Sequence, residues 1–138
     1  MIAVDTNVLV YAVDANEPVK GARAVALLKE LESQPTVLLW QVVCEFGAVL
    51  LRKKPKSDIN VGIPDVLNAW MGMFPVVTPS PAVVRMAWKL IDAHQMSYWD
   101  SLLIAACIDS GVTRLYTEDL QGKPVIESIE IVNPFAST

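Results

Sequence analysis

The chain has 138 residues, of which 53% are hydrophobic, and its 11 basic and 15 acidic side chains give a net charge of −4. This length suits one domain with a proper core, so we expect residues 1–138 to form a single domain. The negative net charge is the wrong sign for a protein that binds nucleic acid through a broad cationic face, although a metal ion and a local basic cluster can still hold phosphates. Because no apolar run approaches membrane-spanning length and no signal-like segment opens the chain, we expect a cytoplasmic protein without membrane contact.

Short apolar segments alternate with helical patterns along the chain. The predicted strands are 2–4, 36–40, 75–78, 114–117 and 129–132. The predicted helices run from about 7 to 14, 18 to 33, 41 to 54, 64 to 74, 81 to 95 and 98 to 110, where proline and glycine mark starts and ends. Strands that alternate with helices are typical of a parallel sheet covered on both faces. We therefore expect an α/β fold with a mainly parallel sheet of about five strands.

Four carboxylates stand in apolar surroundings, where a fold has little use for charge: Asp5, Glu45, Asp100 and Asp119. A buried carboxylate without a partner is strongly unfavourable, and no Lys or Arg lies within four residues of Asp5, Glu45 or Asp100. Asp5 and Asp119 follow predicted strands, whose carboxyl ends meet at one edge of a parallel sheet, so we expect the four acids to converge there. Their natural partner is a hard divalent cation, Mg²⁺ or Mn²⁺, which indicates metal-dependent phosphate chemistry.

Three of these acids also have an ordinary structural explanation. Asp5 fits the N-cap of the following helix as well as it fits a ligand. Asp100 stands three residues after Ser97, which is the capping-box pattern, and Asp119 fits a turn. Glu45 has no such explanation, because it lies on an apolar helix face away from either end. Taken together, the four positions favour a shared site over four separate structural roles.

Around these acids the chain resembles a PIN-domain protein, and most of all a VapC-type toxin of a toxin–antitoxin pair. The matching segments are VDTNVL (4–9), CEF (44–46), YWDSLLIAA (98–106), LYTEDLQ (115–121) and IEIVNPF (129–135), so the resemblance spans essentially the whole chain. It implies a three-layer α/β/α sandwich and a Mg²⁺- or Mn²⁺-dependent endoribonuclease. It also implies a homodimer that a small antitoxin protein silences by covering the site.

The resemblance also implies roles for individual residues. The catalytic and metal-binding acids of the family fall on Asp5, Glu45, Asp100 and Asp119. Thr6 and Asn7 are supporting residues beside the first acid, and Glu118 remains an alternative to Asp119 as the fourth acid. A basic cluster is expected to contact the RNA backbone without reading its sequence, although by itself it fits a solvated helix end better: Arg52, Lys53, Lys54 and Lys56.

Two other classes of function compete with this interpretation. In a non-catalytic binding module, the acids would be caps and turn residues, and the apolar helices 63–74 and 83–94 would form a docking face. A phosphoacceptor signalling domain also gathers acids at strand ends, but Lys123 is the only candidate for its lysine and lies in a poor context. The high apolar fraction further predicts a dimer or antitoxin surface near Trp70 and Met71.

Overall fold

The structure is a computed structural model and describes residues 1–53, 62–120 and 122–136. In this part of the chain a six-stranded sheet has the order β3-β2-β1-β4-β6-β5. Its strands are β1 (Ile2–Val4), β2 (Thr36–Leu39), β3 (Val76–Val77), β4 (Arg114–Tyr116), β5 (Val125–Ile126) and β6 (Ile129–Val132). β5 runs antiparallel to β6, and the other strands pair in parallel. The expected mainly parallel sheet is confirmed, with β5 as an additional strand that the sequence pattern did not predict.

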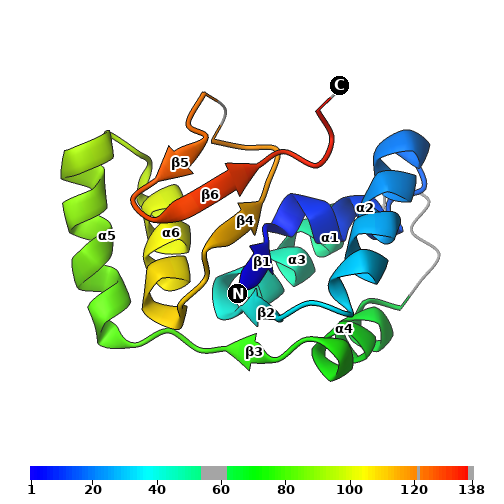
Figure 1. The fold of residues 1–138 in the computed structure, drawn as a ribbon. Coiled ribbons are helices and arrows are strands. Elements are labelled where there is room, and N and C mark those ends of the chain that lie inside the picture. Colours follow the sequence, from blue (N-terminus) through cyan, green and yellow to red (C-terminus); the bar gives the residue numbers. More distant parts are fainter. Residues whose placement is uncertain (54–61, 121, 137–138) are drawn as a thin grey trace.

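Six helices in the described residues cover the two faces of this sheet: α1 (Thr6–Val13), α2 (Pro18–Leu31), α3 (Trp40–Lys53), α4 (Ile63–Met73), α5 (Pro81–His94) and α6 (Tyr98–Ser110). α1 packs against α2 and α3, and α3 contacts α4. α5 and α6 pack together at the other side of the sheet (Figure 1). The fold is therefore the expected α/β/α sandwich. Residue 54, where the third helix was predicted to end, lies outside the described residues.

The helix boundaries follow the local signals in the sequence. Pro18, Pro64 and Pro81 each stand in the first turn of a helix, where the missing N–H of proline costs no intrahelical bond. α6 ends at Gly111, whose φ of 78° lies in the left-handed region that glycine adopts without steric cost. These positions agree with the predicted starts and end.

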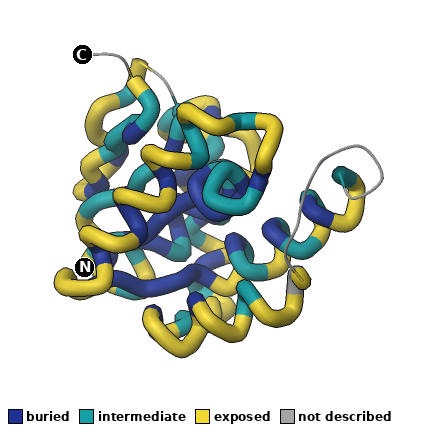
Figure 2. Tube along the Cα trace, turned by 90° about the vertical axis from the view of Figure 1, so that its right-hand side faces the viewer, coloured by how far each residue is buried: buried dark blue, intermediate teal, exposed yellow. Residues whose placement is uncertain are grey.

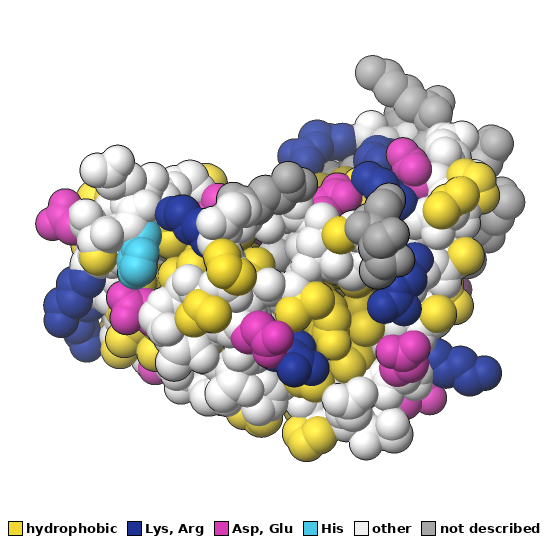
Figure 3. Space-filling model, turned by 45° about the horizontal axis from the view of Figure 1, so that its top comes forward, with side chains coloured by type: hydrophobic (Ala, Val, Ile, Leu, Met, Phe, Trp, Pro, Cys, Tyr) yellow, Lys and Arg dark blue, Asp and Glu magenta, His cyan; other side chains and the backbone are white. Residues whose placement is uncertain are grey.

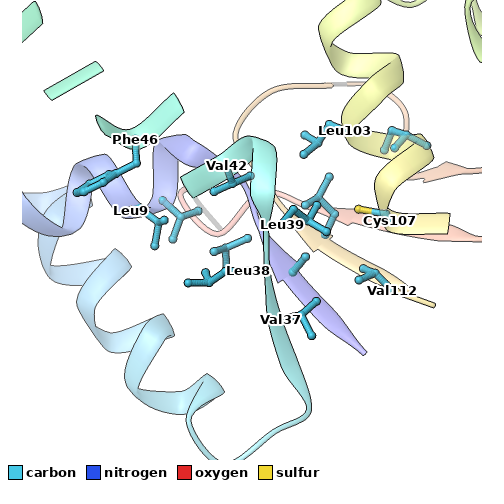
Figure 4. Close-up of a cluster of buried hydrophobic side chains, with 14 of the residues drawn as sticks. Leu9, Val37, Leu38, Leu39, Val42, Phe46, Leu103, Cys107 and Val112 are labelled. Carbon is cyan, nitrogen blue, oxygen red and sulfur yellow. The ribbon is translucent and has the colours of Figure 1, made fainter. Parts of the chain in front are cut away.

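The core fills the space between the two helical layers and the central strands. Figure 4 shows Leu9 and Phe46 against one side of β2, and Leu103 and Cys107 on its other side. All four residues of β2 are buried, as expected for a strand covered on both faces. Figure 2 shows the buried segments in the interior of the molecule and exposed segments around them. Burying each large apolar side chain contributes roughly 1.5–3 kcal/mol. This packing holds the strand ends, and hence the residues that follow them, in fixed positions.

Trp70 belongs to this core and not to a partner surface. Its side chain is only 7% exposed and packs edge-on against Phe46, with 5.1 Å between the ring centroids. The prediction that Trp70 contributes to a dimer or antitoxin surface is therefore wrong, although Met71 beside it is exposed. Among the described residues, the large exposed aromatic side chains lie elsewhere, at Trp40, Trp88, Tyr98 and Trp99.

The order of the strands reverses between β1 and β4. From β1 the chain continues to β2 and β3 on one side of the sheet, and then returns to β4 on the other side. Open α/β sheets bind their ligands at such a switch point, outside the carboxyl ends of the strands. The Asp5 N–H donates to the Tyr116 carbonyl over 2.8 Å, which joins the two strand ends. No helix among residues 1–53, 62–120 and 122–136 is both long and apolar enough to cross a membrane.

Candidate active site

Asp5 lies at the carboxyl end of β1 and is 7% exposed. Its Oδ1 accepts the Thr6 N–H over 2.7 Å, and its Oδ2 accepts the Thr117 hydroxyl over 2.8 Å. Burial raises the pKa of Asp5 to about 6, against the lowering effect of these two hydrogen bonds, and the charges of Asp119 and Glu45 raise it further. Asp5 does cap α1, but it accepts from the first helical N–H and not from the second or third, as an N-cap usually does.

Glu45 points from α3 toward the start of α1. Its Oε2 accepts the Thr6 hydroxyl over 2.9 Å, and its Oε1 accepts the Gln41 side-chain amide over 2.9 Å. The same amide donates to the Trp99 carbonyl over 3.2 Å, which ties α3 to the start of α6. Gln41 was not predicted as a site residue. Its signal in the sequence is the spacing of four residues from Glu45, at which helical side chains meet.

Asp119 is the third residue after β4 and faces Asn7. The Asn7 side-chain amide donates to Oδ2 of Asp119 over 3.3 Å and to the Thr117 hydroxyl over 3.4 Å. The Asp119 N–H also donates to the Thr117 hydroxyl, over 3.0 Å. Partial burial raises the pKa of Asp119, and the charges of Asp100 and Glu118 raise it further. Thr117 was not predicted as a site residue either.

Glu118 belongs to a different set of contacts, on the side of α2. It accepts hydrogen bonds from the Tyr11 hydroxyl and from the Lys20 ammonium group, the latter over 3.0 Å. The structure therefore places Asp119, and not Glu118, against Asn7 and Thr117. This arrangement favours Asp119 as the fourth acid.

Asp100 stands in the first turn of α6. Its N–H donates to the Ser97 hydroxyl over 3.2 Å, so Ser97 caps the helix as the sequence predicted. The Asp100 carboxylate returns no hydrogen bond to the Ser97 N–H among the described residues, so the capping box is only half formed. Its charge instead acts on Asp119, whose pKa it helps to raise.

Three of the four acids line one hollow of about 280 Å³. Its wall consists of Asp5, Glu45 and Asp119 together with Thr6, Asn7, Val10, Tyr11, Val49 and Lys53. We call it the acid hollow. Asp100 is not part of the wall, but it lies within electrostatic range of Asp119. The structure thus brings the predicted acids to one edge of the sheet, three in direct contact with the hollow and one beside it.

The predicted basic cluster is only partly described. The Lys53 ammonium group forms an ion pair with the buried Asp14 over 2.9 Å, and this hydrogen bond lowers the pKa of Asp14. Arg52 is exposed, whereas Lys54 and Lys56 lie outside the described residues. The carboxyl ends of β1 and β4 point to the top of Figure 1, which comes forward in Figure 3. There the basic side chains lie in separate groups with acidic side chains between them.

The acid hollow offers oxygen donors of the kind that a hard divalent cation prefers. Within the described part of the chain, no Lys, Arg or His forms an ion pair with any of the four acids. The buried Oδ1 of Asn7 also has no hydrogen-bond partner there. No group of three or more His, Cys, Asp or Glu side chains among these residues is arranged to hold a metal ion. The chemistry of the donors therefore fits a divalent cation, while their arrangement is not that of a preformed metal site.

Comparisons with known proteins give the same fold. Residues 2–122 match the sequence model of the PIN domain. The VapC20 toxin of Mycobacterium tuberculosis, described as cleaving the sarcin–ricin loop, is 16% identical with a TM-score of 0.68, over 94% of this chain and 99% of that chain. VapBC2 of Rickettsia felis, bound to promoter DNA, is 16% identical with a TM-score of 0.70, over 96% and 98%. A toxin–antitoxin complex from Klebsiella pneumoniae is 13% identical with a TM-score of 0.69, over 98% of each chain. A comparison with curated proteins gave no significant match.

Proposed function

The chain belongs to the PIN domain family, and on this premise we propose that it is a metal-dependent endoribonuclease, the toxin of a VapBC-type toxin–antitoxin pair. The observation that carries the proposal is the gathering of Asp5, Glu45 and Asp119 around one hollow at the switch point of the sheet, with Asp100 beside it. Acids in these surroundings, without basic partners among the described residues, suit a site that binds a cation and a phosphodiester.

Asp5, Glu45, Asp100 and Asp119 would hold Mg²⁺ or Mn²⁺, directly or through bound water. The cation supplies Lewis-acid polarisation of the phosphodiester and lowers the pKa of a water molecule. The protein's own part is orientation: Thr6 and Gln41 fix both oxygens of Glu45, and Asn7 fixes one oxygen of Asp119. Attack by water leaves a 5′-phosphate on the product. The single histidine, His94, is paired with Glu127, so the chain offers no pair of histidines for metal-free cleavage through the 2′-hydroxyl.

A cleavage assay tests this proposal. Protein freed of contaminating nucleases should cleave RNA weakly or not at all in excess EDTA, and Mg²⁺ or Mn²⁺ should restore cleavage. Asp119→Asn should abolish the restored activity, whereas Asp92→Asn, which changes an exposed acid of α5, should not. Full activity in EDTA would contradict the mechanism. If the protein neither cleaves RNA nor is stabilised by metal, the alternative function is a non-catalytic binding module. This alternative is favoured by the absence, among the described residues, of a group of acids already arranged to hold a metal ion.

The proposed partners are RNA in the cytoplasm, a small antitoxin protein and a second copy of the chain. A hollow of about 490 Å³ supports the homodimer, because it is lined mainly by apolar side chains and adjoins exposed aromatic ones. Trp40 and Trp99 line it and are 49% and 65% exposed. Its charged lining residues are both acidic, Glu45 and Asp109, which disfavours RNA as the occupant. One face that carries both a hollow and projecting aromatic rings suits a self-complementary, two-fold interface.

Charge placed in this second hollow should prevent the association of two copies. Val84, on α5, lines the hollow and is 46% exposed, whereas Met73, on α4, is 45% exposed and does not line it. Sedimentation equilibrium should give a dimer for the wild type and for Met73→Glu, and a monomer for Val84→Glu. A wild type that stays monomeric at high concentration would remove the homodimer. If the wild type stays monomeric and the Val84→Glu variant no longer binds the antitoxin, this face would be assigned to the antitoxin.

A further inference from the structure

Thr117 lies at the centre of the acid hollow's hydrogen bonds, although its hydroxyl is itself wholly buried. A hydroxyl has one proton to donate and two lone pairs that accept. Thr117 donates to Oδ2 of Asp5 over 2.8 Å. It accepts from the Asp119 N–H over 3.0 Å and from the Asn7 side-chain amide over 3.4 Å. The bonding capacity of this hydroxyl is therefore complete, and all three partners belong to the predicted site.

These contacts give the hydroxyl a fixed direction. Both of its acceptor positions face N–H donors, so its proton points at Asp5. The Asp5 carboxylate is then held at each oxygen, by Thr6 at Oδ1 and by Thr117 at Oδ2. Each carboxylate oxygen keeps a further lone pair for a cation. The orientation of this acid is thus set by two donors that carry no charge and do not compete with a metal ion.

The backbone of Thr117 is anchored as firmly as its side chain. Its N–H donates to the Val132 carbonyl over 2.9 Å, which continues the pairing of β4 with β6. A threonine suits this extended position because its branched side chain favours β conformations. Through Thr117, the end of β4 therefore fixes the position of the Asp119 main chain and the orientation of the Asp5 carboxylate.

We propose that Thr117 is a positioning residue that fixes Asp5 and Asp119 relative to each other and thereby sets the affinity of the acid hollow for a divalent cation. The inference rests on the proposed function, because it requires the acids to hold a metal. Hydrogen-bond donors that orient metal ligands typically change metal affinity 10- to 100-fold when they are removed. Thr117 itself holds no metal in this scheme and acts only through its partners.

The test is a calorimetric titration of the metal-free protein with Mn²⁺, without RNA. Thr117→Val keeps the shape of the side chain but removes the hydroxyl, and should bind Mn²⁺ about 10- to 100-fold more weakly. Thr117→Ser restores the hydroxyl and should recover most of the affinity. Thr36→Val is the matched control, because Thr36 is also buried and donates to the Leu31 carbonyl over 3.2 Å at the opposite end of β2. It should leave Mn²⁺ affinity unchanged.

The outcomes separate this inference from the function on which it rests. A wild type that binds no Mn²⁺ would contradict the proposed metal-dependent activity. A wild type that binds Mn²⁺ as tightly as Thr117→Val would overturn the role of Thr117 and leave the proposed activity intact. Equal weakening in Thr117→Val and Thr117→Ser would also overturn it, since only the first lacks the hydroxyl. If Thr117→Val does not fold, Thr117→Ala is titrated in its place with the same expectation. Thr117→Ala removes the hydroxyl without placing a methyl group beside Asp5.

Discussion

The Thr6 hydroxyl donates to Oε2 of Glu45 over 2.9 Å and so joins the first turn of α1 to α3 across 39 positions of sequence. Thr6 also supplies the N–H that holds Oδ1 of Asp5. A single residue therefore orients two of the acids, one through its backbone and one through its side chain. Gln41 holds the other oxygen of Glu45. The carboxylate of Glu45 is fixed in this way by neutral donors alone.

We expect Thr6→Val to lower metal-dependent RNA cleavage about 10- to 100-fold, because Glu45 loses one of the two donors that orient it. The free energy of unfolding should fall by only about 1 kcal/mol, the usual net worth of one hydrogen bond. Thr6→Ser keeps the hydroxyl and should retain most of the activity. Single-turnover cleavage and chemical denaturation measure the two effects. Full activity in Thr6→Val would show that this hydrogen bond does not matter to the reaction.

The raised pKa of Asp5 predicts that the metal-free protein loses stability as the pH rises. The pKa rises from 3.8 to about 6 in the folded state, so the folded chain binds more protons than the unfolded chain between these values. Stability therefore decreases as pH rises from about 4 to 6, by roughly 3 kcal/mol in total, and stays at the lower level above that pH. Asp5→Asn should remove this decrease. Denaturation in EDTA from pH 4 to 7 should give curves that converge at low pH and favour the variant at neutral pH. A wild type that gains stability relative to the variant across this range would contradict the sign.

The fold was largely predictable because its signals are local. Pro81 and Gly111 mark the start of α5 and the end of α6 by restrictions on their own backbone, and these restrictions act in any context. β5 was missed because two residues show no periodicity. It forms at a tight turn in which Glu127 adopts a φ of 54°. This left-handed conformation is uncommon for glutamate and so is not predicted by the residue type.

The site was predictable only in part, for a different reason. The acids stand out because a charged residue in an apolar segment requires an explanation. Their convergence could be predicted because the carboxyl ends of parallel strands meet at one edge of the sheet. Thr117 carries no such signal, since a threonine beside a strand is ordinary, and its partner Asp5 is 112 positions away. The misplacement of Trp70 has the same origin: an apolar helix pattern does not reveal whether a ring meets Phe46 or solvent.

Two neighbouring cations at the end of α3 should differ in what they do. Lys53 pairs with the buried Asp14, so Lys53→Met should lower stability by about 1–2 kcal/mol at neutral pH, a reduced value because Lys53 is 40% exposed. The hydrogen bond from Lys53 lowers the pKa of Asp14, so this contribution is present above the ordinary aspartate pKa and is lost as pH falls and Asp14 becomes protonated. Denaturation at pH 7 and at pH 3 measures the difference.

Arg52 is exposed and should contribute to RNA affinity if the basic cluster contacts the RNA backbone. Arg52→Gln should leave stability unchanged, weaken binding to RNAs of different sequence by similar factors, and reduce the dependence of log affinity on log salt by about 1. Binding to catalytically inactive Asp119→Asn protein at several salt concentrations measures this slope. An unchanged slope would mean that Arg52 is a solvated helix end and nothing more.

Asp100→Asn separates the two roles open to Asp100. As a member of the site, Asp100 repels Asp119, whose pKa its charge helps to raise. The variant should then lose cleavage while its metal-free stability stays the same or increases. As a helix-capping acid, Asp100 would instead stabilise the N-terminus of α6, and its loss would cost roughly 0.3–1 kcal/mol. The Ser97 cap itself uses the Asp100 main chain and survives in either case.

The matched control for this variant is Asp65→Asn, which changes an acid in the first turn of α4. It should lose the small helix-terminus contribution and keep full cleavage. Thermal melts in EDTA and in Mg²⁺ provide the comparison, because a ligand that binds only the folded state raises its stability in proportion to its affinity. Mg²⁺ should stabilise the wild type and Asp65→Asn by similar amounts, and Asp100→Asn by less. An Asp100→Asn protein that melts lower in EDTA, responds fully to Mg²⁺ and cleaves RNA would place Asp100 outside the site, because each of these results requires its charge to act only on the helix.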